Sequence, residues 1–372
     1  MKTSGRYRLG TLEKGLTVLE LLERSGHPLR IQEIVSETGF ERGGVFRILC
    51  TLEDCGYIER LHDKRYRANF RRRRPRLGYS APLSGTPFRR DVTSGIEKAA
   101  AAASIELIML NSSGTNPDED VVNAQVFIDA KVDIVIMFQP LDLVAHVLAD
   151  RFVAAGLPVI AVENPIPGAI FFGGNNYRAG LMAGNALGSF ARDRWNRHFD
   201  RLILLESSLT PPATRARLSG TVEGLRQILS GFPDSSIIHL DGLADREKTR
   251  AVMAKLLQTL PPENLLLVSA FNDPSAIGAV EAIRAAGREN TAAVVGQNGT
   301  AESRAEMCRP GTPLIGSVAY FPEQYGDKLV TLVRAILNRE KTPLALYTEH
   351  VLLDRSNLRR YYPDSTTHTA IQ

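Results

Sequence analysis

The apolar residues of the first seventy positions recur at helical spacing in three short segments. The first segment carries Leu12, Leu16 and Leu19 on one face, which is the spacing of an amphipathic helix. The second surrounds Ile34 and the third spans residues 45–52, and a glycine follows each of them. Glycine commonly closes a helix, because it adopts the left-handed conformation without strain. The pattern therefore predicts three short helices.

A hairpin with basic residues follows the third helix. Residues 57–61 are typical of a strand, Asp63 and Lys64 of a turn, and Tyr66 of a second strand flanked by Arg65 and Arg67. Three helices and a basic hairpin form the layout of a winged helix-turn-helix, whose third helix enters the major groove while the wing follows the backbone. The pattern of the first seventy residues therefore predicts a DNA-binding module.

From residue 77 onward, short apolar runs alternate with segments of helical spacing. The runs are apolar throughout, as expected of parallel strands that are covered on both faces. The predicted strands are Leu77–Ala81, Ile105–Leu110, Ile134–Phe138, Val159–Val162, Leu202–Leu205, Ile237–Leu240, Leu265–Ala270, Ala293–Gly296 and Leu314–Val318. Repeated strand–helix units predict an α/β fold with parallel sheets and helices on both faces.

The charge is unevenly distributed along the chain. The net charge is +4 and the composition is globular, with 44% hydrophobic and 23% charged residues. Residues 1–78 hold 17 Lys and Arg against 10 Asp and Glu, whereas the remainder carries a small acidic excess. A basic front end on a mildly acidic body indicates that only one part of the chain meets a polyanion.

Several classes of protein are disfavoured by what the sequence lacks. The beginning of the chain has no apolar core of a secretory signal, and no apolar run is long enough to span a membrane. Cys50, Cys55 and Cys308 show neither disulfide nor zinc spacing. No phosphate-binding loop, zinc-protease motif or nucleophile elbow is present. We therefore expect a cytoplasmic protein that is not an enzyme and needs no metal or cofactor.

The front end resembles the DNA-binding domain of IclR-type regulators. The similarity lies in Leu12-Glu13-Lys14-Gly15-Leu16, Pro28-Leu29 before Ile31 and Ile34, Arg47-x-Leu49-x-x-Leu52 before Gly56-Tyr57-Ile58, and Lys64-x-Tyr66-Arg67. The resemblance implies a recognition helix over residues 41–54. The residues expected to face DNA there are Arg42, Gly43, Gly44, Phe46 and Arg47, and those of the wing are Lys64, Arg65 and Arg67.

The glycine pair and the arginine run leave alternatives open. Gly43-Gly44 replaces a hydroxyl pair that is usual in the family, and each helical glycine costs roughly 1 kcal/mol relative to Ala. Residues 71–74 are four arginines, which could form a minor-groove arm, a phosphate clamp or a soluble linker. We take Arg71 and Arg72 as further DNA contacts. A winged helix can also serve as a protein-interaction module, with Arg42 and Arg47 simply solvated.

The residues that follow the predicted strands have the chemistry of a polyol site. Ligands of parallel α/β sheets bind beyond the carboxyl ends of the strands. Aromatic, carboxylate, guanidinium and amide side chains suit a hydroxyl-rich ring, which needs both bidentate hydrogen bonds and a flat apolar contact. The candidate ligand contacts at these strand ends are Phe88, Glu163, Asn164, Arg215, Asn272, Asn298 and Tyr320.

The same stretches resemble periplasmic sugar-binding proteins, whose domain LacI-type repressors also use. The similarity lies in Gly78-Tyr79-Ser80 before Thr86-Pro87-Phe88, Leu157 to Asn164, Asn175-Asn176-Tyr177-x-Ala179-Gly180, Asn272-Asp273-Pro274-x-Ala276-x-Gly278-Ala279 and Val294-Val295-Gly296-x-Asn298-Gly299. The resemblance implies two lobes joined by three crossovers, near residues 174–176, 297–299 and 320–324. Arg215 or the nearby Arg217 would cross the cleft, and Asp273 would be a ligand contact or a helix cap. Asn298 and Tyr320 depart from the usual Asp and Gln.

Together these features predict an N-terminal winged helix-turn-helix domain joined to a two-lobed, type I periplasmic-binding-protein-like domain. The expected boundaries are 6–70 for the first domain, 71–76 for a basic linker, 77–362 for the second domain and 363–372 for a tail. The predicted function is a homodimeric transcription regulator that binds double-stranded operator DNA under control of a sugar, or of a polar ligand such as a cyclitol. The alternative is a solute-binding receptor for transport or chemosensing, without a DNA role.

Overall fold

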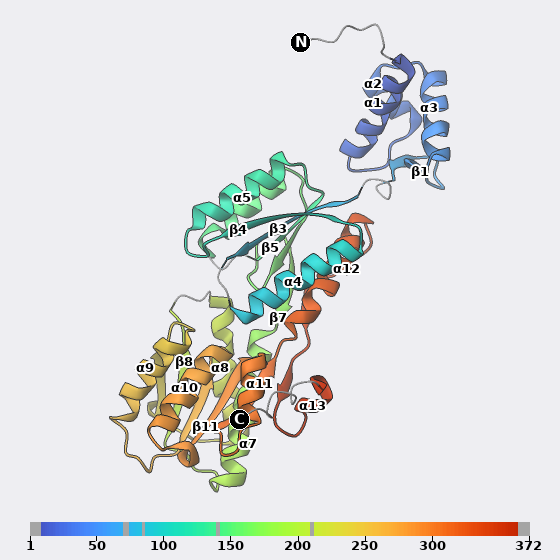
Figure 1. Ribbon diagram of the computed structural model, residues 1–372. Coiled ribbons are helices and arrows are strands. Elements are labelled where there is room, and N and C mark those ends of the chain that lie inside the picture. The colour runs from blue at the N-terminus through green and yellow to red at the C-terminus, as the bar shows by residue number, and fades with distance from the viewer. Residues whose placement is uncertain (1–8, 70–73, 84–85, 139–141, 209–211, 364–372) are drawn as a thin grey trace, which may run out of the picture. The chain divides into compact units, whose positions relative to one another are not determined.

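The computed structural model describes residues 9–69, 74–83, 86–138, 142–208 and 212–363 (Figure 1). These residues form two compact units. The first unit comprises the chain up to Arg76 together with Ser104–Glu106, and the second comprises Leu77–Ala103 and the chain from Leu107 onward. The predicted basic contacts Arg71 and Arg72 lie outside the described residues.

The first unit confirms the three predicted helices and the hairpin. Its elements are α1 (Gly10–Arg24), α2 (Ile31–Thr38), α3 (Arg42–Asp54), β1 (Ile58–Arg60) and β2 (Tyr66–Ala68). The strands pair antiparallel, with Glu59 opposite Arg67. Gly39 ends α2 in the left-handed conformation at φ 68°. The buried core draws on every element, and its residues are Val18, Leu21, Leu22, Leu29, Ile34, Val45, Ile48, Leu49, Ile58, Tyr66 and Ala68.

The second unit contains two six-stranded sheets, each at the centre of one lobe. The sheet of the first lobe, here the N-lobe, has the order β13-β7-β6-β5-β3-β4. Its strands are β3 (Arg76–Pro82), β4 (Glu106–Ser112), β5 (Ile134–Met137), β6 (Val159–Val162), β7 (Ile170–Gly174) and β13 (Ala345–Thr348). The pairs from β3 through β5, β6 and β7 to β13 are parallel.

The sheet of the other lobe, the C-lobe, has the order β14-β12-β11-β10-β8-β9. Its strands are β8 (Arg201–Glu206), β9 (Ile237–Asp241), β10 (Leu266–Ala270), β11 (Ala292–Asn298), β12 (Leu314–Ala319) and β14 (Val351–Leu353). All neighbours are parallel except β14, which runs antiparallel to β12. All nine predicted strands are present, whereas β7, β13 and β14 were not predicted.

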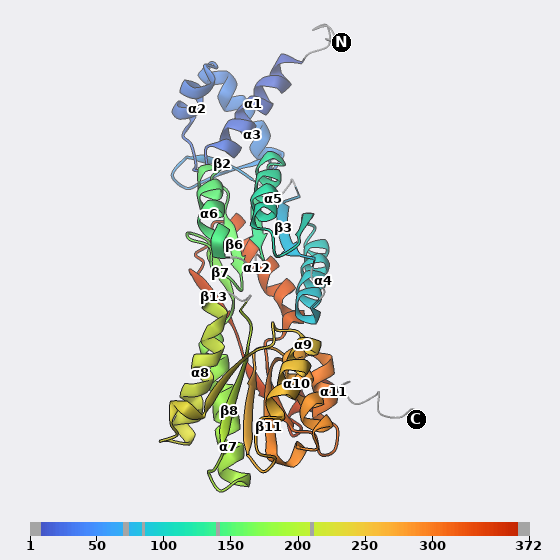
Figure 2. The same ribbon diagram turned by 90° about the vertical axis from the view of Figure 1, so that its left-hand side faces the viewer.

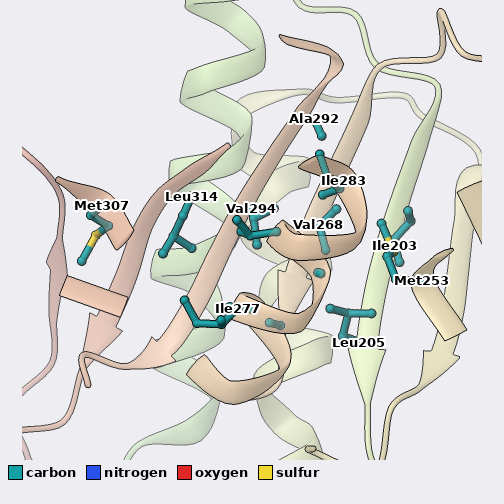
Figure 3. Close-up of a cluster of buried hydrophobic side chains, with 14 of the residues drawn as sticks. Ile203, Leu205, Met253, Val268, Ile277, Ile283, Ala292, Val294, Met307 and Leu314 are labelled. Atoms are coloured by element: carbon teal, nitrogen blue, oxygen red, sulfur yellow. The ribbon is translucent and has the colours of Figure 1, made fainter. Parts of the chain in front are cut away.

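Helices connect the strands, as the α/β prediction requires. The N-lobe helices are α4 (Pro87–Ala102), α5 (Pro117–Asp129), α6 (Ala145–Ala154) and α12 (Tyr325–Leu337), with the 3₁₀ turns η2 (Asp142–Val144) and η5 (Pro322–Gln324). The C-lobe helices are α7 (Asn176–Arg194), α8 (Pro212–Ile228), α9 (Arg246–Leu257), α10 (Asp273–Ala285), α11 (Ala301–Met307) and α13 (Leu358–Tyr361), with η3 (Asp234–Ser236) and η4 (Glu289–Thr291). Figure 3 shows Ile277 and Ile283 of α10 against Val268 and Val294 in the C-lobe core.

Glycines bring two helices of the C-lobe into backbone contact. Helices α7 and α8 run alongside each other (Figures 1 and 2). A Cβ atom added at Gly184 of α7 would lie 2.0 Å from the carbonyl oxygen of Thr221 on α8. One added at Gly224 of α8 would lie 2.3 Å from the carbonyl oxygen of Leu181 on α7. Only glycine permits this approach.

Three chain crossovers join the lobes, and one of the predicted crossovers is wrong. The chain passes from β7 into α7 near residues 174–176, and from β12 into η5 and α12 near residues 320–324, as predicted. The predicted crossover at residues 297–299 does not exist, because β11 and β12 lie side by side in the C-lobe sheet. The third crossover is instead at residues 348–351, between β13 and β14.

Candidate functional site

The outer face of α3 carries the side chains predicted to meet DNA. Arg42, Phe46 and Arg47 are exposed, with Phe46 at 49%. The opposite face of the helix holds the buried core residues Val45 and Leu49. The arginines make no ion pair with any other described residue. The face therefore offers two cations and one apolar ring to an anionic partner.

Gly43 and Gly44 lie on this helix in open space. A Cβ at Gly44 would meet nothing within 4 Å, and one at Gly43 would meet only the Glu41 carboxylate at 3.9 Å. Packing inside the unit therefore does not require glycine at either position. Each glycine destabilises the helix by roughly 1 kcal/mol relative to alanine, and no packing contact in the core compensates for this loss.

The wing offers fewer unpaired cations than its sequence indicated. Arg65 Nε lies 2.5 Å from Asp63 Oδ2, and the Arg67 guanidinium pairs with Glu59 on the neighbouring strand. Lys64 at the tip is exposed and has φ 61°. The wing therefore exposes Lys64 at its tip, whereas its two arginines are already paired with carboxylates.

A second group of predicted residues meets between the two lobes of the second unit. Phe88 lies at the start of α4 in the N-lobe, and its ring packs against the C-lobe core. Its ring centroid is 5.5 Å from Tyr325, 6.3 Å from Tyr320 and 6.4 Å from Phe138, and each pair is arranged edge to face. We call Phe88, Glu163, Arg217, Tyr320 and Tyr325 the inter-lobe cluster.

Glu163 follows β6 and is held by groups from two other segments. Its Oε1 accepts a hydrogen bond from the Tyr325 hydroxyl at 2.6 Å and one from the Gly174 N–H at 3.2 Å. Burial raises the pKa of this carboxyl, while the Tyr325 hydroxyl and the nearby Arg217 act in the opposite direction. Its backbone has φ 62°. Asn164 beside it is also buried.

The arginine of the inter-lobe cluster is Arg217, and Arg215 lies apart from it. Arg215 is exposed on α8. Arg217 is buried, donates through Nε to Asn176 Oδ1 at 2.7 Å, and donates through a terminal nitrogen to the Phe271 carbonyl at 3.0 Å. Its guanidinium lies 4.7 Å from the Tyr320 ring centroid and 5.0 Å from that of Phe271. Such contacts are typical cation–π geometry.

Asn272 and Asp273 hold helix ends. Asn272 Oδ1 accepts from the Ser275 N–H at 2.9 Å, as the cap of α10, and its Nδ2 donates to the Ala244 carbonyl at 2.9 Å. Asp273 is fully buried and accepts from the Ser317 and Ser303 hydroxyls at 2.6 and 2.7 Å. Burial raises the pKa of Asp273, and these donors lower it. Asn272 thus caps the helix, the role that the sequence left open for Asp273.

Asn298 is the last residue of β11, and Tyr320 directly follows the neighbouring strand β12. Asn298 Oδ1 is buried and accepts no hydrogen bond from a described residue, and its backbone has φ 106°. An unpaired buried acceptor costs about 1–3 kcal/mol. Tyr320 is fully buried and donates to Gln297 Oε1 at 3.2 Å. Its ring centroid lies 4.3 Å from that of His350.

Residues from all three crossovers meet at this point. Gly174 belongs to the first, Tyr320 to the second and His350 to the third. A Cβ at Gly174 would lie 2.4 Å from Tyr320 Cε1 and 3.0 Å from His350 Cε1. Burial, with the positive charges of Arg217 and Arg178, lowers the pKa of His350 to about 4, so that its imidazole is neutral at pH 7.

Sequence reasoning missed several members of these groups. Tyr325 and His350 were not singled out, because the segments around them gave no strand or motif signal. Arg217 could have been preferred to Arg215, since it shares a helix face with the buried Thr214 and Thr221. Helical spacing of three and four residues places all three on the inner side of α8.

The family comparisons cover both units. Residues 11–62 match the IclR helix-turn-helix domain, and residues 77–341 match the periplasmic binding protein domain. The chain belongs to the periplasmic binding protein domain family. In this chain the family's domain stands on the same polypeptide as an IclR-type helix-turn-helix. Among the described residues no helix is long and apolar enough to cross a membrane.

Curated relatives and solved structures are similar to two thirds or more of the chain. The chain is 28% identical over 288 residues to the ribose import binding protein of Bacillus subtilis, covering 73% of this chain and 87% of that protein. It is 26% identical over 259 residues to the Escherichia coli K12 counterpart, covering 68% and 82%. A solute-binding protein of Actinobacillus succinogenes with bound D-allose superposes with TM-score 0.66 at 18% identity, over 77% of this chain and all of that one. One from Bacillus halodurans with bound myo-inositol gives 0.67 at 20%, over 77% and 97%.

Proposed function

We propose that the protein is a DNA-binding transcription regulator whose affinity for its operator is controlled by a sugar or sugar-like effector bound between the two lobes. One observation carries the proposal: a helix-turn-helix unit with exposed arginines on its third helix is covalently joined to a periplasmic binding protein domain, whose curated relatives are ribose import binding proteins. A regulator requires both parts on one chain, whereas a receptor for transport needs only the second.

The proposed DNA-binding residues fall into two groups, those that contact bases and those that contact phosphates. Arg42, Phe46 and Arg47 on α3 are the candidates for base and backbone contacts in the major groove, with Lys64 of the wing on a phosphate. The arginine run at residues 71–74 supplies further phosphate contacts. Because Arg65 and Arg67 are paired with acids, their removal weakens binding less than removal of Arg47.

The effector contact uses the inter-lobe cluster and the buried amide. The rings of Phe88 and Tyr320 provide apolar faces, and Glu163 and Arg217 provide charged partners for vicinal hydroxyls. Asn298 Oδ1, which accepts no hydrogen bond from a described residue, receives one from a ligand hydroxyl. Asn164 and Asn272 complete the proposed set. Because the cluster joins both lobes and the crossovers, an occupied site favours closed lobes.

The effect on DNA follows from linkage. An effector that binds the closed form more tightly than the open form shifts the population, and couplings of this kind are typically ~1–3 kcal/mol, about 5- to 150-fold in affinity. Two chains on a two-fold operator convert lobe closure into a change of spacing between recognition helices. The protein is therefore proposed to act as a homodimer.

The test selects genomic fragments on the immobilised full chain and then measures binding of the enriched duplex by fluorescence anisotropy at about 150 mM salt. We expect Arg47→Ala to weaken binding at least tenfold and Arg24→Ala, an equal loss of charge on α1, to leave it nearly unchanged. D-ribose, D-allose and myo-inositol are then titrated. No enriched duplex, or equal effects of the two variants, would refute the DNA role.

The ribose-import relatives favour one other candidate, a solute-binding receptor without a DNA role. It predicts that one of these sugars binds the chain and raises its thermal midpoint, and that no duplex is enriched. Enzymatic turnover is not proposed, since both matched families are binding domains.

A further inference from the structure

The outer face of α3 carries one large apolar side chain among its cations. Phe46 is 49% exposed, and the exposed Arg42 and Arg47 stand four residues before it and directly after it. The ring takes no part in the buried core of the unit, to which this helix contributes Val45 and Leu49 on its other side. A single exposed apolar residue needs no explanation by itself, so the ring becomes informative only through its surroundings.

Gly43 leaves the space beside the ring open. Residues three and four positions apart are neighbours on a helix surface, so Phe46 and Arg47 both adjoin Gly43. Side chains on a helix lean toward the preceding turn, which here has no side chain at this position. Neither packing nor backbone conformation requires the glycine, because a Cβ there would meet only Glu41 Oε1 at 3.9 Å and Gly43 has no positive φ. The space is therefore available to a group outside the unit.

Charge indicates which part of a DNA duplex fits this space. Glu41 precedes the helix, and its exposed carboxylate lies beside Gly43 instead of capping the first turn. A carboxylate here repels a phosphate, since two anions would share one end of the helix. A base edge carries no net charge, and the amino group of cytosine donates to carboxylates. The first turn of α3 therefore suits the floor of the major groove better than the sugar–phosphate backbone.

We propose that Phe46 contacts the 5-methyl group of a thymine in the major groove and thereby selects thymine at one position of each half-site. Thymine alone among the four bases presents a methyl group there, and phenylalanine is one of the side chains that contact it. Because the position of Gly43 holds no side chain, the helix can approach the base pair closely enough for the ring to reach it. The proposal rests on the proposed function, since it names a base that the regulator recognises.

The test compares thymine with uracil in the duplex that the full chain enriches. Replacing a thymine by uracil removes the methyl group and leaves every hydrogen-bonding group of the base pair in place. Each thymine of one half-site is replaced in turn, and affinity is measured by fluorescence anisotropy at about 150 mM salt. We expect one replacement to weaken binding about fourfold, which is the effect of one buried methyl group, and the others to change it little.

Protein variants then assign the methyl contact to the ring. Phe46→Ala is expected to bind the thymine and uracil duplexes equally, and both more weakly than the wild type binds thymine. Arg47→Ala on the same face is the matched control, expected to weaken both duplexes about tenfold and to keep the fourfold difference. Gly43→Ala fills the open space, so it is expected to weaken binding by roughly fivefold or more, as one mismatched base pair does, while the first unit becomes more stable to heat. Far-UV circular dichroism checks that each variant folds.

The outcomes separate this contact from the proposed function. If the duplex binds and no uracil replacement weakens it, the thymine contact is wrong and the DNA role stands. If the fourfold difference persists in Phe46→Ala, another side chain contacts the methyl group and the assignment to Phe46 is wrong. Unchanged affinity of Phe46→Ala for the thymine duplex would also overturn the proposal and assign the exposed ring to a protein partner. If no duplex is enriched, the DNA role fails and the thymine contact fails with it.

Discussion

Replacing Gly184 by Ala tests the backbone contact between α7 and α8. The new Cβ would lie 2.0 Å from the Thr221 carbonyl oxygen and 2.7 Å from the Leu225 nitrogen. An unstrained carbon–oxygen contact needs about 3.4 Å or more, so α7 and α8 must move apart by more than about 1 Å. That movement loosens the shared core, in which Leu187 and Leu225 are fully buried.

The magnitude follows from two opposing terms. Overpacking of a tight core costs about 1–3 kcal/mol and occasionally more, and the clash here is with backbone, which cannot rotate away. The alanine returns up to about 1 kcal/mol of helix propensity. Because the clash is with backbone, we expect the overpacking cost to lie at or above the top of its range, about 3–4 kcal/mol, which leaves a net loss of about 2–3 kcal/mol. For a unit of this size, that lowers the midpoint by roughly 4–12 °C.

The single tryptophan, Trp195, ends α7 and packs on Phe190, so its fluorescence reports unfolding of the C-lobe directly. The matched control is Gly44→Ala, the same change in the first turn of α3, where a Cβ meets nothing within 4 Å. It is expected to leave the Trp195 transition in place and to stabilise the first unit by up to ~1 kcal/mol. An unchanged or higher Trp195 midpoint in Gly184→Ala would refute the packing argument.

Three further predictions concern single side chains. Arg217→Ala is expected to lower effector affinity at least tenfold by calorimetry, and Arg215→Ala to leave it unchanged, because only Arg217 belongs to the inter-lobe cluster; equal losses would contradict the assignment. Burial raises the pKa of Asp120 from 3.8 to about 6, so the folded state holds a proton that the unfolded state loses as pH rises from about 4 to 6. Asp120→Asn should therefore stabilise the protein at pH 7 by roughly 2–3 kcal/mol and by little at pH 4, and a pH-independent effect in urea titrations would disprove this. Tyr362 donates to Glu323 Oε1 at 2.9 Å, so Tyr362→Phe should cost about 1 kcal/mol in the same titrations, while a loss well above this would show that the ring also moves.

Local patterns predicted the elements that carry a strong periodic signal. The three helices and the hairpin of the first unit follow from leucine spacing and closing glycines. The nine strands of the second unit follow from continuous apolar runs. These signals are local because residues close together in the sequence determine whether one face of a helix, or both faces of a strand, is apolar.

Features that depend on distant partners were not predicted. Strand β13 pairs with β7 and β14 pairs with β12, and each is only three or four residues long. A segment this short becomes a strand because it forms hydrogen bonds with the edge of a sheet that the rest of the chain has built. The prediction of a crossover at residues 297–299 was wrong for the same reason. The sequence of a turn does not determine which sheet the next strand joins.

The candidate sites divide in the same way. Arg42 and Arg47 could be assigned to the outer face of α3 because the helical spacing of Val45, Ile48 and Leu49 places the core on the opposite face. Pairing of Arg67 with Glu59, by contrast, depends on the strand register. Tyr325 and His350 reach Glu163 and Tyr320 across the crossovers, and no sequence distance indicated that they would.

The sequence by itself determined the two kinds of unit, their order and the residue types available at the strand ends, because these follow from local periodicity, charge and motifs. Only the tertiary structure decided which arginine joins the inter-lobe cluster, which asparagine caps a helix and which keeps an unpaired buried oxygen, and where the three crossovers meet. The physical reason is that such roles are set by contacts between segments far apart in the chain. The energy of those contacts depends on distances that only the folded chain defines.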